Sequence, residues 1–428
     1  MNFKESVDYL YGLGNEVLAM KLGLENIGKL LDALGNPQTK YLKVQIAGTN
    51  GKGSTCAFLE AICLQAGIEV GTTTSPHLVS VTERVKINGQ EISEKDFARH
   101  ATHIREVSEK LVENGELKTV PTYFEQVTAI ALNAFAESKI ELAILETGLG
   151  GRFDATTAAN AEIVAITPID YDHQKFLGET LTEIAAEKAA IIRADTKVIV
   201  ANQSQEALDL ILKRCAKFGI SPNLAESVKV EVVSDDKFQM TNFKTSKAEY
   251  TNVRVNLLGK HQIENAKVAI LLAETLQASF KITTEDIIEG LQTAIHKGRL
   301  EFCNNFLFDG AHNISGAKAL REYLNEFIKQ PITMIFGSMK DKDLTEIAKT
   351  LFPKAEKLIL TKPDNLRAME TAELLQFVPK DFDQGNVFVA ETVAESIKKA
   401  REVSSENHLM LVTGSLYLVG EVQKILKS

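Results

Sequence analysis

Short apolar runs alternate with helical patterns along the first part of the chain. Four runs are continuous, rich in β-branched residues and bounded by glycine, proline or polar residues: YLKVQIAG, ELAILETG, EIVAITPI and KVIVAN. Such runs are typical of buried strands. Between them, stretches such as STCAFLEAICLQAG and EQVTAIALNAFAES repeat apolar residues at helical spacing. This alternation predicts a parallel α/β sheet with helices on both faces.

A second alternation begins near residue 300. Five more strands are predicted by the runs FLFDGAHN, PITMIFGS, EKLILT, NVFVAE and HLMLVTGS, and helical stretches such as TVAESIKKAREV follow most of them. This pattern predicts a separate, smaller Rossmann-like α/β domain. The segment TAIHKGRLE reads as the linker, so we expect an N-terminal domain with a P-loop ATPase-like parallel sheet over 1–296 and a C-terminal domain over 297–428.

Residues 223–256 follow a third pattern. The stretches VKVEVVSDDKF and AEYTNVRVNL are polar yet strand-like. They predict an antiparallel patch on the first domain.

Composition narrows the class of protein. A chain of 428 residues is too long for one ordinary hydrophobic core, so two or three domains are expected. The net charge of −9 argues against a nucleic-acid partner, whose binding face is usually basic. The start lacks the pattern of a signal peptide, and no run approaches the ~18 apolar residues of a membrane helix. The four cysteines form no Cys-x-x-Cys pair and no zinc-spaced cluster. We therefore expect a cytoplasmic protein with reduced thiols and no membrane partner.

The stretch VQIAGTNGKGSTCA, residues 44–57, resembles a phosphate-binding loop with an unusual order. The standard pattern ends in Gly-Lys-Ser or Gly-Lys-Thr, whereas here an extra glycine, Gly53, follows Lys52. A predicted strand enters the loop and a predicted helix leaves it, so backbone N–H groups and Lys52 can attract phosphate. The alternative is a tight strand-to-helix turn. A lysine between two glycines at a helix start favours the phosphate site.

Two further stretches carry candidate metal ligands. In ELAILETGLGGR, the strand ends in Glu146, where an acidic residue can reach magnesium; the alternative is a carboxylate that faces solvent. In TPIDYDHQKFLGETLTEIAAEKAAIIRAD, His173 follows a strand and is a plausible ligand.

Lys188 is predicted to point inward. It shares one helical face with four apolar residues, namely Leu181, Ile184, Ile191 and Ile192. A buried ammonium needs a partner or a lowered pKa, and carbamylation by CO2 would turn the amine into a metal ligand. The spacing alone favours a simpler arrangement, a snorkelling lysine or a salt bridge.

Other polar residues gather at a helix start, before the second domain and at a strand end: His261, Gln262, Asn265, Arg299, Asp309, His312 and Asn313. Ligands bind at the carboxyl ends of parallel strands, although the first three residues taken alone fit helix caps. The closing TGSLYLVGE is not a G-x-G-x-x-G pattern, which argues against a dinucleotide site.

Together these motifs resemble a known family. Their order is AGTNGKGS, TSPHL, TYFE, ETGLGGRFDAT, DHQKFLGETLTEIAAEKAAII, HQIENA, GRLE, DGAHN and GSLYLVGEV, and it covers nearly the whole chain. It resembles the folylpolyglutamate synthases and bifunctional dihydrofolate synthases of the Mur ligase superfamily. The resemblance implies an ATP-dependent ligase that adds L-glutamate to dihydropteroate and to reduced folates through an acyl phosphate. The alternatives are a folylpolyglutamate synthase only, or an ATPase switch without ligase activity.

The resemblance also implies residue roles. Those for ATP are Asn50, Gly51, Lys52, Gly53, Ser54, Asn265, Arg299 and Asp309, with His312 in the same loop. Ser75 and Glu146 would hold one Mg²⁺; His173 and a carbamylated Lys188 would hold the other, which overrides the preference from spacing. The pterin substrate would lie near Leu22, Gly23, Leu24, Glu25, Thr122, Tyr123, Phe124, Glu125, Phe153, Asp154 and Ala155.

Some features refine the resemblance. Thr157, Ala190 and Ile314 depart from the family pattern in loops and remove no proposed ligand. The stretches TSPHL and TERV and the run Asp154–Thr156 favour a bifunctional member, with Asp154 as the residue that decides dihydropteroate use. The short stretch before the phosphate loop favours this family over the cell-wall Mur ligases, which carry an extra UDP-binding domain. The family further suggests a monomer and activation by K⁺. Because the implied ATP contacts come from the first domain, from Arg299 in the linker and from Asp309 in the second domain, we expect the domains to close about a hinge near residues 295–300.

Overall fold

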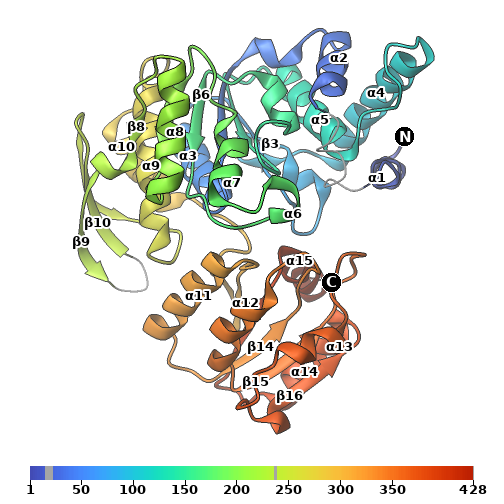
Figure 1. Ribbon diagram of the computed structural model, residues 1–428, viewed down its shortest axis with the longest axis vertical. Coiled ribbons are helices and arrows are strands. Elements are labelled where there is room, and N and C mark those ends of the chain that lie inside the picture. The colour runs from blue at the N-terminus through green and yellow to red at the C-terminus, as the bar shows by residue number, and fades with distance from the viewer. Residues whose placement is uncertain (15–22, 236–238, 428) are drawn as a thin grey trace.

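The computed structural model describes residues 1–14, 23–235 and 239–427 and shows two lobes joined by one segment (Figure 1). We call the elements up to α10 the N-terminal lobe and those from β12 onward the C-terminal lobe. The predicted α/β class is confirmed, since each lobe is built on a mostly parallel sheet covered by helices. No helix of the described residues is long and apolar enough to cross a membrane.

The N-terminal lobe is built on an eight-stranded sheet with the order β4-β3-β2-β5-β1-β6-β7-β8. All neighbours from β2 to β8 pair in parallel, and β3 and β4 add an antiparallel edge. The four predicted central strands are confirmed. The strands are β1 (Leu42–Ala47), β2 (Val70–Thr73), β3 (Lys86–Ile87), β4 (Gln90–Glu91), β5 (Leu142–Glu146), β6 (Ile163–Ile166), β7 (Lys197–Val200) and β8 (Asn223–Leu224).

Helices cover both faces of this sheet because the side chains of each strand alternate between two cores. Along β5, Leu142 and Ile144 join one hydrophobic cluster, and Ala143 and Leu145 join another. The α-helices are α1 (Phe3–Gly12), α2 (Glu25–Ala33), α3 (Lys52–Gln65), α4 (Glu94–Glu113), α5 (Tyr123–Glu137), α6 (Gln174–Leu177), α7 (Leu181–Ala189), α8 (Gln205–Lys217), α9 (His261–Leu276) and α10 (Thr284–Thr293). Short 3₁₀ helices span Pro37–Lys40, Val81–Arg84, Ala155–Ala159 and Ala225–Ser227.

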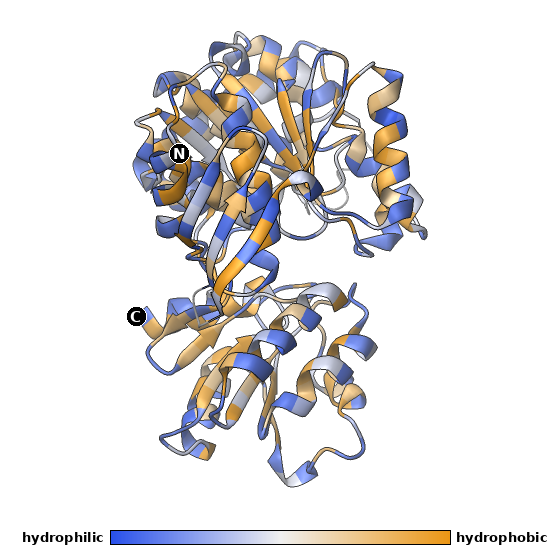
Figure 2. Cartoon of the chain, turned by 90° about the vertical axis from the view of Figure 1, so that its left-hand side faces the viewer, coloured by the Kyte–Doolittle hydropathy of each residue, from blue (hydrophilic) through white to orange (hydrophobic). Residues whose placement is uncertain are grey.

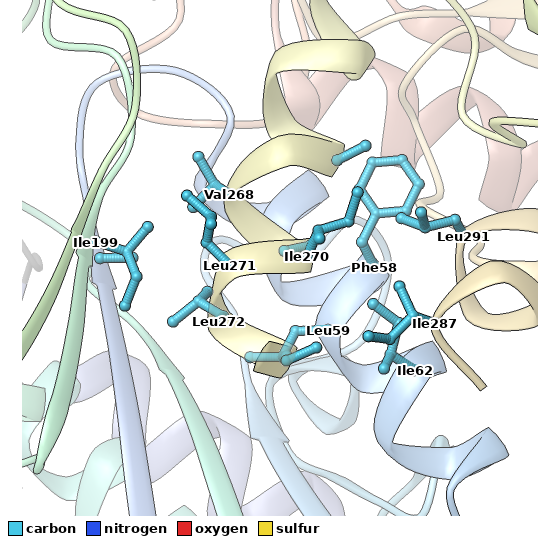
Figure 3. Close-up of a cluster of buried hydrophobic side chains, with 14 of the residues drawn as sticks. Phe58, Leu59, Ile62, Ile199, Val268, Ile270, Leu271, Leu272, Ile287 and Leu291 are labelled. Atoms are coloured by element: carbon cyan, nitrogen blue, oxygen red, sulfur yellow. The ribbon is translucent and has the colours of Figure 1, made fainter. Parts of the chain in front are cut away.

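The phosphate-loop helix α3 lies within the largest of these cores. Figure 3 shows Phe58 and Ile62 of α3 packed between Ile270 of α9 and Ile287 and Leu291 of α10. All five side chains are fully buried. The helix that leaves the phosphate loop is therefore packed into a fully buried core.

The predicted antiparallel patch is confirmed as a three-stranded sheet. It has the order β11-β10-β9, with β9 (Lys229–Asp235), β10 (Gln239–Lys244) and β11 (Glu249–Arg254). It projects from one side of the N-terminal lobe (Figure 1). The predicted start of the patch was wrong, because residues 223–224 form β8 and pair with β7 in the large sheet.

The C-terminal lobe has a six-stranded sheet with the order β12-β13-β17-β14-β15-β16. The five predicted strands are confirmed as β13 (Phe306–Phe308), β14 (Ile332–Phe336), β15 (Lys357–Thr361), β16 (Val387–Ala390) and β17 (Leu409–Thr413). The sequence prediction missed β12 (Glu301–Cys303), which pairs antiparallel with β13. The strands are apolar and the outer helix faces polar (Figure 2).

Helices again lie on both faces of this second sheet, since two separate hydrophobic clusters flank it. They are α11 (Ile314–Phe327), α12 (Leu344–Leu351), α13 (Thr371–Leu374), α14 (Val393–Val403) and α15 (Leu416–Lys427), with 3₁₀ turns at Phe352–Lys354, Leu375–Phe377 and Gln384–Asn386.

The connecting segment, residues 294–300, is hydrogen-bonded at each end to a different lobe. The Ala294 carbonyl accepts a hydrogen bond from the Asn256 side chain of the N-terminal lobe. The Leu300 N–H donates to the Asp309 carboxylate of the C-terminal lobe. Between these points Ile295 is 72% exposed.

Candidate active site

The glycines of the phosphate loop are required by close contacts. A side chain at Gly48 would come 1.9 Å from the Thr167 hydroxyl, and one at Gly51 would come 2.2 Å from the Asn265 side-chain oxygen. Gly51 also has a φ of +85°, which side chains rarely adopt. The loop thus lies between the end of β6 and the start of α9, and its residues line the cavity described below.

Two lysines converge on the backbone at the loop entrance. Lys52 Nζ and Lys188 Nζ donate to the Gly48 carbonyl over 3.1 Å and 2.9 Å. Burial, and then the charge of Lys52, lowers the pKa of Lys188 to about 7. A large part of the Lys188 amine is therefore neutral near neutral pH.

The preference from spacing for a snorkelling or salt-bridged Lys188 was wrong. The side chain is buried, and the contact that the structure gives its amine is with a backbone carbonyl. The predicted helix was also too long. Helix α7 ends at Ala189, so Ile191 and Ile192 are buried beyond its end and do not share its face.

Glu146 and Ser75 meet at the carboxyl ends of β5 and β2. One Glu146 oxygen accepts the Ser75 backbone N–H over 3.0 Å. Burial raises the pKa of Glu146, and the Lys52 charge opposes this rise. The Ser75 hydroxyl is buried and has no hydrogen-bond partner among the described residues. The solvent-facing alternative for Glu146 is therefore wrong, and the two oxygen donors suit a magnesium ion.

His173 lines the same cavity as this pair and lies beside charged residues from both lobes, Asp172 and Asp341. Its ring is 3.8 Å from Asp341 of the C-terminal lobe. Burial lowers the pKa of His173 to about 4, so the imidazole is neutral and able to bind a metal. No group of three His, Cys, Asp or Glu side chains with metal-binding spacing occurs in residues 1–14, 23–235 and 239–427. The predicted donor sets instead include a serine and a lysine.

One cavity of about 350 Å³ unites the residues predicted for ATP and metal. We call it the phosphate-loop cavity. It is lined from the N-terminal lobe by the loop and α9, and from the C-terminal lobe by Asp309 and His312. The predicted residues along it are Asn50, Gly51, Lys52, Gly53, Ser54, Ser75, Glu146, His173, Lys188, Asn265, Arg299, Asp309 and His312.

A second cavity of about 140 Å³ lies beside it and contains most of the predicted pterin residues. We call it the Phe124 cavity. The predicted residues along it are Gly23, Leu24, Thr122, Phe124, Glu125, Phe153, Asp154 and Ala155. Leu22 lies outside the described residues.

Two predicted pterin residues do not line the Phe124 cavity. Glu25 is exposed and pairs with Lys29 over 2.8 Å. Tyr123 is buried and stacks on Tyr11, with ring centroids 5.6 Å apart. Helix α5 begins at Tyr123, and successive helical positions point in directions about 100° apart, so Phe124 lines the cavity while Tyr123 enters the core.

The Asp154 carboxylate accepts hydrogen bonds from residues of its own loop. Its Oδ2 accepts the N–H groups of Gly148 and Leu149, and its Oδ1 accepts the N–H and hydroxyl of Thr156. Burial raises the pKa of this carboxyl, and the four hydrogen bonds oppose the rise. Asp154 thus fixes the glycine loop that forms one side of the Phe124 cavity.

The two cavities share a wall. The residues common to both are Ser75, Pro76, Gly148, Leu149, His173, His312 and Leu416. Groups bound in the two cavities can therefore meet beside Ser75 and the two histidines.

The sequence prediction missed the contribution of the C-terminal lobe to the Phe124 cavity. Met339, Lys342, Arg367 and Tyr417 line it. Lys342 Nζ is 2.6 Å from Asp172 of the N-terminal lobe, and both side chains are buried. Lys342 and Tyr417 follow the predicted strands β14 and β17, and that position at a strand's carboxyl end was the available indication.

Known families match both parts of the chain. The Mur ligase middle domain matches residues 46–273, and the dihydrofolate synthetase C-terminal domain matches residues 297–426. A dihydrofolate synthase/folylpolyglutamate synthase of Bacillus subtilis is 33% identical over 97% of both chains. A dihydrofolate synthetase of Saccharomyces cerevisiae is 32% identical over 95% of this chain and 98% of its own.

Solved structures agree with these matches. The folylpolyglutamate synthase of Mycobacterium tuberculosis complexed with ADP has a TM-score of 0.92, at 26% identity over 100% of this chain and 98% of its own. E. coli FolC in complex with DHPP and ADP has a TM-score of 0.87, at 27% identity over 100% and 98%. With its sequence matched over nearly its full length and its two lobes found in these structures, the chain belongs to the dihydrofolate synthase/folylpolyglutamate synthase family of Mur ligases.

Proposed function

We propose that this protein is an ATP-dependent ligase that joins L-glutamate to dihydropteroate and to reduced folates. The observation that carries the proposal is the wall shared by the phosphate-loop cavity and the Phe124 cavity. A phosphate donor on one side and a carboxylate on the other meet there. The relatives bear the names of both activities, and a related structure holds DHPP and ADP together.

In the proposed reaction, an oxygen of the pterin substrate's carboxylate attacks the γ-phosphorus of ATP. The bond from that phosphorus to the bridging oxygen breaks, ADP leaves, and an acyl phosphate forms. The neutral amine of L-glutamate then attacks the acyl carbon, phosphate leaves, and the nitrogen loses a proton. The amide bond is the product.

The chain's own residues are placed to hold the charges of this reaction. Lys52 and Arg299 line the phosphate-loop cavity and would offset the triphosphate. Arg367 lines the Phe124 cavity, where its positive charge suits a carboxylate of the incoming glutamate, whereas Lys342 in the same cavity is paired with Asp172. The Asp309 carboxylate accepts the Leu300 and Ala311 N–H groups and thereby fixes the backbone beside Arg299.

Two magnesium sites belong to this proposal, and the residues present fit them. Ser75 and Glu146 would hold one ion, since the Ser75 hydroxyl is buried without a protein partner among the described residues. Neutral His173 and Lys188 would hold the other. Bound Mg²⁺ neutralises phosphate charge and favours attack by the carboxylate.

Lys188 would serve as a ligand in the form of a carbamate. Its nitrogen attacks the carbon of CO2, a nitrogen–carbon bond forms, and a proton is released to solvent. The lowered pKa of about 7 supports this step because only the neutral amine is nucleophilic.

The arrangement of the chain forms the rest of the proposal. The lobes correspond to domains 1–296 and 297–428, and they close about residues 295–300 to assemble the site. The resemblance supports a monomeric state and activation by K⁺, and the four unpaired cysteines support a cytoplasmic, reducing location.

The test is phosphate release by the purified protein with Mg-ATP and L-glutamate, with dihydropteroate or tetrahydrofolate added in parallel. We expect release with both pterins, matched by glutamylated products. Release with tetrahydrofolate alone would make the protein a folylpolyglutamate synthase only. If neither pterin raises release above the ATP-only rate, the ligase proposal is wrong and an ATPase without ligation takes its place.

A further inference from the structure

The extra glycine of the phosphate loop has a specific neighbour. A side chain at Gly53 would come 2.7 Å from Cε1 and 2.8 Å from Nε2 of His296. These distances are shorter than carbon atoms tolerate, so the imidazole ring occupies the space that a larger residue would need. The order Gly-Lys-Gly-Ser therefore suits a loop that accommodates a ring from 243 positions later in the chain.

His296 also bonds to the next residue of the loop. Its Nδ1 lies 3.2 Å from the Ser54 hydroxyl oxygen. The same oxygen accepts a hydrogen bond from the Gln262 amide over 3.2 Å, and Gln262 in turn accepts one from Asn265. With its oxygen used as an acceptor, the Ser54 hydroxyl can donate its hydrogen to His296 Nδ1. The Ser54 hydroxyl is thus oriented by α9 and by the connecting segment.

The ring comes from the segment that joins the two lobes. Ala294 is fastened to the N-terminal lobe, whereas the Gly298 carbonyl accepts the Gly310 N–H of the C-terminal lobe over 2.9 Å. His296 lies between these anchors and three residues before Arg299. A rotation of the lobes about this segment would shift the ring relative to Gly53 and Ser54.

We propose that His296 is a positioning residue that makes the nucleotide-binding geometry of the phosphate loop depend on the orientation of the two lobes. The inference rests on the proposed ATP-dependent function. In the arrangement seen here, the ring covers Gly53 and holds Ser54. When the lobes rotate apart, the ring withdraws, the loop loses this support, and the nucleotide is held less tightly.

The test is a double-mutant cycle between His296 and Gly53, read by calorimetric binding of Mg-ADP. We expect His296→Ala to weaken binding by about tenfold, the effect of one lost hydrogen bond and its packing. Gly53→Ala should weaken binding by a similar factor because its methyl displaces the ring. In the double variant the second change should add at most about a further twofold, since the ring is already absent.

Two more variants separate positioning from general destabilisation. His296→Asn keeps an acceptor near the position of Nδ1 and should recover most of the lost affinity, whereas His296→Leu should not. Ile295→Ala, in the same segment but exposed, is the matched control and should bind Mg-ADP like the parent protein. In steady state, His296→Ala should raise the KM for ATP and leave the KM for dihydropteroate unchanged.

The outcomes are distinct. Independent effects that multiply in the double variant, or parental affinity in His296→Ala, would overturn the role of His296. A parent protein that binds Mg-ADP and shows the coupling, but ligates no glutamate, would leave the positioning role intact and contradict the proposed function instead.

Discussion

The phosphate-loop cavity and the Phe124 cavity adjoin each other but are built differently. The first contains the whole phosphate loop, whose glycines lie against Thr167, Asn265 and His296. The second is lined mainly by side chains, among them Phe124, Phe153 and Tyr417, contributed by both lobes. A phosphate chain is the same in every round of the reaction, so a fixed backbone suits it. A cavity formed by side chains can differ in selectivity without changing the chemistry.

The strongest test of this contrast is Glu146→Gln. The change removes a buried carboxylate that lines the phosphate-loop cavity and should lower kcat by at least about a hundredfold. The loss should be equal with dihydropteroate and with tetrahydrofolate, because the phosphate-loop cavity serves both. Steady-state phosphate release measures it.

Glu141→Gln is the matched control, since Glu141 is exposed just before the same strand. It should retain the parental rate. A Glu146→Gln protein that keeps more than about a tenth of the parental kcat would remove Glu146 from the proposed magnesium site.

Next in size is the effect of pH on Lys188. In CO2-free buffer the protein should lose activity, and restored CO2 should reactivate it. At constant dissolved CO2, reactivation should be about tenfold faster at pH 8 than at pH 6, because the neutral fraction of an amine with a pKa of about 7 rises in that range.

Lys188→Met should not respond to CO2 at any pH. Reactivation that is independent of pH, or a mass spectrum of active protein kept under CO2 that shows no carbamate, would contradict this assignment.

Asp154→Asn should affect substrate binding in the Phe124 cavity without affecting ATP binding in the phosphate-loop cavity. Asparagine offers a single oxygen, so it cannot accept all four hydrogen bonds that Asp154 accepts from its loop. We expect the KM for dihydropteroate to rise about tenfold while the KM for ATP stays within about twofold. Equal increases in both constants would show that the two cavities are not independent. The exposed Asp209→Asn serves as control.

The smallest effect is expected at Glu25. It lies outside the Phe124 cavity, and its hydrogen bond with Lys29 lowers the pKa of this exposed carboxyl. Glu25→Gln should therefore change the KM for either pterin by less than about twofold. A rise of fivefold or more would place Glu25 at the bound substrate and enlarge the cavity beyond the residues that line it here.

The same contrast explains what the sequence could predict. The central strands and the phosphate loop depend on contiguous residues, so their patterns are readable without a structure. The inward direction of Lys188 followed from helical spacing, but its contact with the Gly48 carbonyl did not, because the two residues are 140 positions apart. The contributions of Met339, Lys342 and Arg367 depend on how the lobes face each other, which local patterns do not encode.

Glycine positions show this limit most clearly. The sequence marks Gly53 as unusual, yet the reason is the ring of His296 in another part of the fold. Tyr123 shows the same limit: the motif TYFE predicts pterin contacts at all four residues, but helix geometry directs the Tyr123 ring into the core and places Phe124 along the cavity.

The connecting segment at residues 294–300 also determines how the protein can be cut. Ile295 is exposed there, and each lobe has its own sheet and hydrophobic clusters. A protease that cleaves this segment would release two fragments that each retain a core. Because cleavage requires the segment to leave its anchors at Ala294 and Leu300, ligands that hold the lobes together would slow it. The rate at which the two fragments form therefore reports the fraction of time that the two lobes spend apart.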